Sequence, residues 1–388
     1  MEDSADIHAP RLHLSGLRLS DFRNYLASRL NFGPAHAVFT GENGAGKTNI
    51  LEAISLLSPG RGIRRANYSD MVRAGAENGF AVHADLQTED GAVSLGTGNG
   101  AEGGGLEPTR RLRVNGAPAK GADAFLEYLR VVWITPQMDG LFSGPSVDRR
   151  RFLDRMVLAI DPAHGARVLD YEKSMRARNK LFEEGGDDPR WFDAIEAQMA
   201  ELGVAIAAAR AELVNLLAGM MALLPEESPF PRAELTLEGA LEERLGLSSA
   251  VELEEAYRAS LRQNRTLDRS AGRSLEGPHR SDLQVRHQPK RMNAALSSTG
   301  EQKALLIGIV LSHARLVSKM TGTAPILLLD EIVAHLDKGR REALFAIIDD
   351  IGAQAFMTGT DRALFDGLGK RATFFLVSHG QVSVDESA

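Results

Sequence analysis

The chain has 388 residues, of which 43% are hydrophobic and 25% charged, a balance typical of a soluble globular protein with one large domain or two lobes. Its net charge of −7 excludes a protein that coats nucleic acid by bulk charge, so any DNA binding must come from a local basic patch. The absence of cysteine excludes disulfides and Cys-ligated metals, and we expect a cytoplasmic protein with no membrane span or export signal.

The first elements along the chain form a strand, glycine loop and helix. Strands are expected at residues 11–22, 28–32 and 35–40, and a helix at 47–57. The run "TGENGAGKTN" at 40–49 lies between them and matches G-x-x-x-x-G-K-[ST], a loop whose backbone N–H groups cradle nucleotide phosphates. Lys47 should reach the terminal phosphates, and Thr48 should ligate Mg²⁺.

The middle of the chain changes from strands to helices. Residues 79–115 are predicted to form antiparallel strands around a glycine-rich hairpin or loop at 95–105, and a buried strand is expected at 129–135. From about 146 to 268 the pattern is helical, with breaks at 183–189 and 223–231. These breaks still leave a mostly helical segment between two strand-rich ones.

A second chemical motif lies near the end of the chain. "PILLLDE" at 325–331 is predicted to be a central parallel strand that ends in two acids, followed by a helix at 339–350 and strands at 353–360 and 373–380. An acid at the carboxyl end of such a strand lies where α/β sheets bind ligands. We expect Asp330 to hold Mg²⁺, directly or through water, and Glu331 to polarise the attacking water.

The segment 296–316 begins with a capping-box pattern, Ser298-x-x-Glu301. It predicts at least a well-capped helix. Because helix N-termini bind anions, the exposed start with Ser298 and Gly300 could also serve a second nucleotide.

Together these motifs resemble a known family. "GENGAGKTN", "SSTGEQK" and "LLLDEIVAHLD" occur in the order found in ABC-type ATPase heads of the SMC-like family, and the stretch between Thr48 and Ser298 is too short for long coiled-coil arms. "FRNY" (22–25), "RRRFLD" (149–154) and "GPHRSDL" (277–283) narrow the resemblance to the RecF family, over nearly the whole chain.

The resemblance implies an α/β fold: a P-loop ATPase lobe from residues 10–120 and 285–388, with a mostly helical lobe of residues 121–284 inserted. It also implies roles for individual residues. Gln137 would sense Mg²⁺ and the γ-phosphate and assist catalysis with Lys47 and Glu331, while Thr358 or Thr360 stands where many ABC ATPases place a switch histidine. The nucleotide contacts implied are Gly41, Glu42, Asn43, Gly44, Ala45, Gly46, Lys47, Thr48, Asn49, Arg23 and Asn24, with Ser298, Gly300, Asp337 and Lys303 acting across a dimer.

The implied function is that of an ATP-dependent homodimer with weak ATPase activity. It would bind gapped duplex DNA and single-strand/double-strand junctions and, with RecR and indirectly RecO, load RecA onto single strands coated by the single-strand-binding protein. For the DNA contacts we single out Arg64, Arg65, Arg73 and Arg149, although such clusters are as often solvated or salt-bridged faces.

Three alternatives share part of this pattern. An ABC transporter ATPase subunit has the same site chemistry but an LSGGQ-type signature in place of "STGEQK". A nuclease of the overcoming-lysogeny type would need a separate nuclease domain with its own acidic cluster after the "PILLLDE" strand. We expect too few residues after Asp337 to form such a domain. A clamp that binds ATP without meaningful hydrolysis is the third alternative, against which Glu331 argues.

Overall fold

The computed structural model describes residues 12–100, 110–186 and 188–385. The chain divides into two compact units, one of Met1–Asp139 with Leu306–Ala388 and one of Gly140–Leu305. These limits differ from the expected division at 120/121 and 284/285. The strand β8 (Val131–Ile134) explains the first difference, because it pairs in parallel with β12 (Ile326–Leu329) and so belongs to the first unit.

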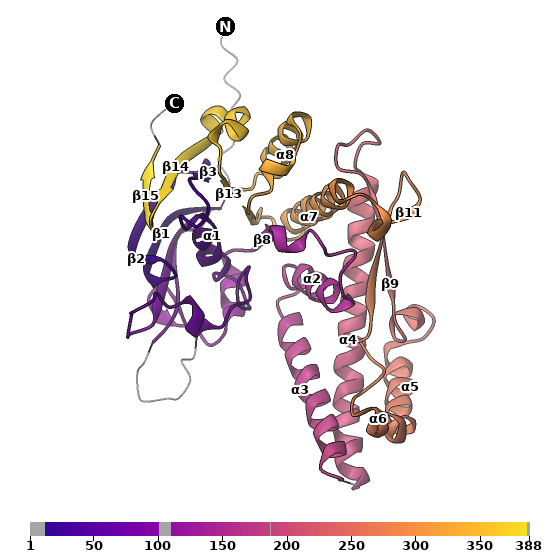
Figure 1. Cartoon of the computed structure of the whole chain (residues 1–388). Helices are drawn as coiled ribbons and strands as arrows, with labels where there is room; N and C mark the ends of the chain where they lie inside the picture. Colours follow the sequence, from indigo (N-terminus) through magenta and orange to yellow (C-terminus); the bar gives the residue numbers. More distant parts are fainter. Residues whose placement is uncertain (1–11, 101–109, 187, 386–388) are drawn as a thin grey trace. The chain divides into compact units, whose positions relative to one another are not determined.

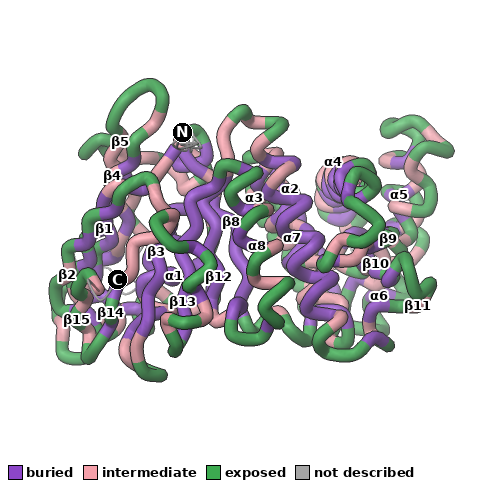
Figure 2. Tube along the Cα trace, turned by 90° about the horizontal axis from the view of Figure 1, so that it is seen from above, coloured by how far each residue is buried: buried purple, intermediate pink, exposed green. Residues whose placement is uncertain are grey.

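The first unit contains two sheets, each with six strands in its described part. The antiparallel sheet has the order β2 (Tyr25–Asn31), β1 (His13–Phe22), β4 (Phe80–Thr88), β5 (Gly91–Asn99), β6 (Arg111–Val114), β7 (Ala117–Pro118). The other sheet has the order β15 (Gln381–Val384), β14 (Ala372–Ser378), β3 (His36–Thr40), β13 (Ala355–Gly359), β12, β8. It is parallel except for β15, and the strands β3, β13 and β12 appear as buried tubes in Figure 2.

One apolar core joins both sheets to the helix α1 (Lys47–Ser55), which lies beside β1 and β3 in Figure 1. Ile50, Leu51 and Ile54 of α1 are fully buried in that core, together with Leu17 of the antiparallel sheet and Phe39 of the parallel one. The helix α8 (Lys338–Ile351) connects β12 to β13, as crossover helices do between parallel strands. The core therefore fixes the start of α1, where the glycine loop ends.

The second unit is built on long helices, as predicted. It contains α2 (Ser146–Leu158), α3 (His164–Glu183), α4 (Pro189–Ala222), α5 (Ala250–Gln263) and α6 (Arg265–Ala271). A three-stranded sheet in the order β11 (Met292–Asn293), β10 (Asp282–His287), β9 (Ala233–Glu238) accompanies them. The helix α7 (Thr299–Thr321) runs from this unit into the first.

Two local predictions are wrong. Residues 95–99, expected in a loop, form the end of β5, because Gly98 lets β5 pass close to β4: a Cβ there would lie 2.3 Å from the Phe80 carbonyl oxygen. Residues 101–105 of that predicted loop lie outside the described residues. Residues 233–238, expected within the helical region, form β9 and pair with β10.

Within the described residues, two helices, α4 and α7, are long and apolar enough to cross a membrane by length and composition alone. Half of the apolar window in α4 and 72% of that in α7 are buried within the fold. Such burial is typical of core helices in soluble proteins, so this composition is weak evidence for a membrane span.

Candidate nucleotide-binding site

The candidate site lies at the carboxyl edge of the parallel sheet. The glycine loop follows β3, Asp330 and Glu331 follow β12, and Thr358 lies in β13 between these two strands. Because parallel strands end at the same edge, residues as far apart in the chain as Thr48 and Thr358 meet there. The predicted convergence of the two motifs is therefore explained by strand order.

The glycine loop accepts hydrogen bonds from the side chains of Asn24 and Tyr25, which precede it in the chain. Asn24 Nδ2 donates to the Ala45 carbonyl at 3.0 Å and the Tyr25 hydroxyl donates to the Gly46 carbonyl at 3.1 Å. Gly46 has φ of 119°, and a Cβ there would lie 2.6 Å from Asn24 Nδ2. Burial raises the pKa of Tyr25, so its hydroxyl stays protonated and remains a donor. Only glycine fits this position.

Lys47 is buried at the start of α1, with 4% of its side chain exposed. Its ammonium group donates to the carbonyls of Gly41 at 2.7 Å and Glu42 at 3.0 Å, and lies 3.6 Å from Glu331 Oε1. The lysine thus holds a positive charge within the loop, where phosphate would bring negative charge.

One carboxylate oxygen of Asp330 accepts hydrogen bonds from two hydroxyl groups. Thr48 Oγ1 and Thr358 Oγ1 both donate to Asp330 Oδ1, each at 2.8 Å. The hydroxyl and the carboxylate are hard oxygen donors, the type that Mg²⁺ prefers, and Mg²⁺ completes its shell with water and phosphate oxygens. No cluster of three His, Cys, Asp or Glu side chains suited to a metal occurs in the described parts of the chain, so a Mg²⁺ here would need those further oxygens.

Glu331 stands on a constrained turn. Its φ of 54° lies in the left-handed region, which is costly for a residue with a side chain. The Glu331 N–H donates to Thr358 Oγ1 at 2.9 Å, and Thr358 is completely buried. Thr358 therefore bridges the Asp330 carboxylate and the Glu331 backbone, a role that the sequence motifs did not reveal.

The "FRNY" arginine is engaged in an ion-pair cluster. Arg23 Nε and Nη2 donate to the two oxygens of Glu52 at 2.8 and 2.6 Å, and Arg64 Nη1 donates to Glu52 at 3.0 Å. Arg64 also donates to Asn49 Oδ1 at 2.5 Å, and Asn49 bonds Asn24. The fully buried Glu52 thus holds Arg23 and Arg64 against α1, and no motif in the sequence marks it.

The remaining candidates lie in a short helix or at the first turn of a long one. Gln137 is exposed in the short helix Pro136–Met138 after β8, and Asp337 caps α8 by accepting from the Arg340 N–H at 2.9 Å. Ser298 and Gly300, in the other unit, are exposed at the start of α7. The Ser298 N–H donates to Glu301 Oε2 at 3.0 Å, as in the predicted capping box. Lys303 is buried, which does not favour the contact with a partner's nucleotide that the resemblance implied.

The proposed DNA-contact arginines all have partners. Arg149, 13% exposed, donates to both oxygens of Asp282 at 2.8 Å and to the carbonyls of Leu141, Phe142 and Gly144. Arg73 pairs with Asp21 at 2.8 Å. These surroundings favour a structural role for Arg149 in particular, since its hydrogen-bond donors are largely taken.

Comparison with known proteins decides the family. The RecF/RecN/SMC N terminal domain model matches residues 13–382. The chain is 61% identical to the DNA replication and repair protein RecF of Mesorhizobium japonicum, over 97% of this chain and 99% of that protein. The chain belongs to the RecF family. The RecF of Brucella suis is 59% identical over 98% of this chain and 99% of its own length. This membership argues against the transporter alternative.

Solved structures agree with the fold. A structure of the recombination mediator protein RecF with ATP, in the RecFOR pathway, matches with a TM-score of 0.85 and 25% identity, over 97% of this chain and 99% of that one. An SMC head domain from Pyrococcus furiosus, bound to the C-terminal domain of ScpA, matches with a TM-score of 0.53 and 15% identity over 96% of each chain. The RecF-family chain therefore has the ABC-type ATPase head fold, as predicted, in a family of DNA replication and repair.

Proposed function

We propose that this RecF-family protein is an ATP-driven DNA clamp of recombinational repair, acting in the cytoplasm. The observation that carries the proposal is the meeting of Lys47, Thr48, Asp330 and Glu331 at one sheet edge, with Lys47 Nζ 3.6 Å from Glu331. A phosphate loop, a hydroxyl–carboxylate pair and a second carboxylate are the parts that nucleotide hydrolysis requires.

Each part has a chemical role in the proposal. The loop from Gly41 to Asn49 would cradle the phosphates through its backbone N–H groups, and Lys47 would neutralise charge on the terminal phosphates. Mg²⁺ would be held by Thr48 and Asp330, with Gln137 contacting it, and would neutralise phosphate charge. Glu331 would orient and polarise the attacking water.

ATP would join two copies of the chain. The exposed Ser298 and Gly300 present a helix N-terminus, whose dipole attracts the phosphates of a nucleotide held by a partner. Asp337 would lie at the seam between the two copies. Because ATP would bind the dimer better than the monomer, binding closes the pair and slow hydrolysis releases it.

The clamp would act on DNA. We infer that the dimer binds gapped duplex DNA and single-strand/double-strand junctions and, with RecR and indirectly RecO, promotes RecA loading onto single strands coated by the single-strand-binding protein. This assignment is supported by the identity with RecF proteins named for DNA replication and repair. With a net charge of −7, contact with DNA requires a local basic surface.

Sedimentation velocity without nucleotide, with ADP and with ATP tests the dimerisation. The wild-type protein should become a dimer with ATP alone. Lys47→Ala should stay monomeric because it loses nucleotide binding, which a fluorescent ATP analogue would confirm. Ser298→Arg should bind nucleotide normally yet stay monomeric, since the arginine blocks the helix N-terminus. A Ser298→Arg protein that dimerised with ATP would refute the trans arrangement.

A further inference from the structure

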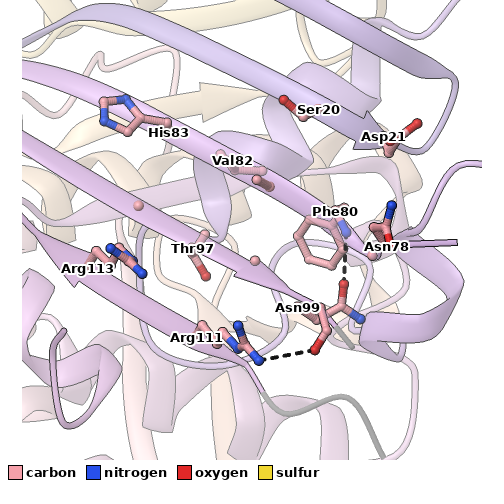
Figure 3. Close-up of a pocket in the computed structure, with 15 residues that line it drawn as sticks. Ser20, Asp21, Asn78, Phe80, Val82, His83, Thr97, Asn99, Arg111 and Arg113 are labelled. Carbon is pink, nitrogen blue, oxygen red and sulfur yellow. Dashed lines mark hydrogen bonds between the residues drawn. The ribbon is translucent and has the colours of Figure 1, made fainter. Parts of the chain in front are cut away.

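The outer face of the antiparallel sheet carries a basic trough that no step of nucleotide hydrolysis uses. One face of this sheet packs in the core, and the residues that alternate with the core residues point the other way. A hollow of about 640 Å³ lies on that outer face, and its lining includes Ser20, His83, Gly96, Gly98, Arg111 and Arg113. Figure 3 shows Arg111 and Arg113 on one strand and His83 on another.

Strand register places three arginines and a histidine in one row across this face. Arg29 pairs with Arg18, Arg18 with His83, His83 with Gly96, and Gly96 with Arg113, on five adjacent strands. With adjacent strands about 4.8 Å apart, the row spans about 19 Å. Arg111 lies in the next row of the same face, opposite Gly98.

The charge of this outer face is positive although the whole chain is acidic. Four arginines (Arg18, Arg29, Arg111 and Arg113) are exposed on this face. Arg18 lies 3.3 Å from Asp85, and the Asp21 carboxylate at the rim is paired with Arg73 at 2.8 Å. The face thus retains a positive excess on a chain with a net charge of −7. Such a local excess is the electrostatic footprint of a nucleic-acid-binding surface.

The floor of the trough is low because it consists of small residues. Ala81, Gly96 and Gly98 lie on the middle strands of the trough. The backbone of a bound polymer can therefore approach the sheet between the arginines. Gly98 has no room for a side chain, whereas a Cβ at Gly96 would meet only the Cβ of Arg113, at 3.6 Å. Gly96 is therefore not required by the packing of the sheet, and its missing side chain keeps the trough open.

We propose that this trough binds the sugar–phosphate backbone of duplex DNA, an inference that rests on the proposed function and gives it a surface. Duplex DNA carries one negative charge per about 1.7 Å of its axis, so a row about 19 Å long that contains three arginines faces several phosphates at once. The contacts are to backbone phosphates and are independent of sequence, as gap recognition in arbitrary sequence requires.

Fluorescence anisotropy with labelled gapped duplex and saturating ATP, measured from about 50 to 200 mM salt, tests the trough. Arg111→Ala combined with Arg113→Ala should weaken binding on the order of tenfold and lower the slope of log affinity against log salt by about 2. Gly96→Asp should weaken binding similarly, whereas Gly96→Ser, which adds a side chain without charge, should weaken it less. Arg190→Ala, at a side chain 90% exposed in the other unit, is the matched control and should bind like wild type.

Each variant is first shown to dimerise with ATP, which verifies its fold and its nucleotide site. Trough variants that dimerise and bind gapped duplex with wild-type affinity and salt slope would overturn the inference and leave the proposed function standing. They would point instead to an acidic segment of a protein partner as the occupant. Wild-type protein that fails to bind the duplex with ATP would overturn the proposed function, and this inference with it.

Discussion

Thr358→Val should slow ATP hydrolysis while leaving ATP binding nearly intact. The Thr358 hydroxyl donates to Asp330 Oδ1 at 2.8 Å and accepts the Glu331 N–H at 2.9 Å, and the side chain is fully buried. Valine keeps the shape but loses both hydrogen bonds. A hydrogen bond to a carboxylate contributes about 1.5–3 kcal/mol, and an unpartnered N–H costs about 1–3 kcal/mol, so about 2.5–6 kcal/mol of support for this turn is removed.

Part of that loss should reach the Glu331 carboxylate, because its left-handed backbone conformation depends on the Thr358 bond. If only about 1.4 kcal/mol affects the transition state, kcat falls about tenfold. The KM for ATP should change little, since the contacts of Lys47 and Thr48 are untouched. Steady-state ATPase measurements in the presence of DNA would record both constants.

Two further variants show whether the hydroxyl itself is responsible. Thr358→Ser keeps the hydroxyl and should retain most of the activity. Thr321→Val is the matched control: it removes a hydroxyl that donates to the Val317 carbonyl at 2.9 Å near the end of α7, and it should lower stability without lowering kcat. A Thr358→Val protein with wild-type kcat would refute the view that Thr358 positions Glu331.

Three further predictions concern hydrolysis, stability and pH. Glu331→Gln should trap the ATP dimer, seen as a dimer that persists in sedimentation velocity after wild type has returned to monomer; a return at the wild-type rate would contradict it. Arg178→Met should lower the melting temperature by roughly 10 °C, because it leaves the buried Asp268 carboxylate, which accepts from Arg178 at 2.6 Å, without its cation, a cost of about 3–5 kcal/mol. The Glu196 carboxylate, which accepts from Arg178 at 3.0 Å, loses one of its two arginines and keeps Arg265. Arg176→Met, at a side chain 69% exposed on the same helix, should melt like wild type, and equal melting of both variants would refute the argument. The hydrogen bond from Lys290, with those from Ser298, lowers the pKa of Glu301 from 4.5 to about 2. The capping of α7 by this carboxylate is therefore fully present above about pH 4.5 and is lost only as the pH falls toward 2. NMR titration of the Glu301 carboxyl should show this midpoint and Lys290→Ala should raise it, whereas a midpoint near 4.5 in both proteins would contradict the argument.

The chemistry of the nucleotide site could be predicted because it is encoded locally. The loop from Gly41 to Thr48 and the acids Asp330 and Glu331 each belong to a short motif with a strand beside it. Their meeting follows from a general rule, that ligands bind at the carboxyl ends of parallel strands. The order β3, β13, β12 then brings both motifs together.

The supporting residues could not be predicted, because their partners are distant in the chain. Thr358 bonds residues 27 and 28 positions away, and Arg23 pairs with a glutamate 29 positions away. Nothing in the local sequence marks such pairs. The same reason explains why basic residues alone were a weak guide to DNA contacts: Arg149 binds Asp282, 133 positions later.

The missed strands have a different cause. β5 is rich in glycine, which normally indicates a loop, but here Gly98 allows close packing on β4. β9 has only six residues within a region of helical composition. Strands so short are defined by their neighbours in the sheet more than by their own periodicity.

The central claim, that ATP controls DNA binding, is tested most directly by fluorescence anisotropy on labelled gapped duplex at one fixed salt concentration, without nucleotide, with ADP and with ATP. The account predicts tight binding with ATP alone. Equal, weak binding under all three conditions would contradict it and leave a nucleotide-binding protein whose ATP site has no link to DNA.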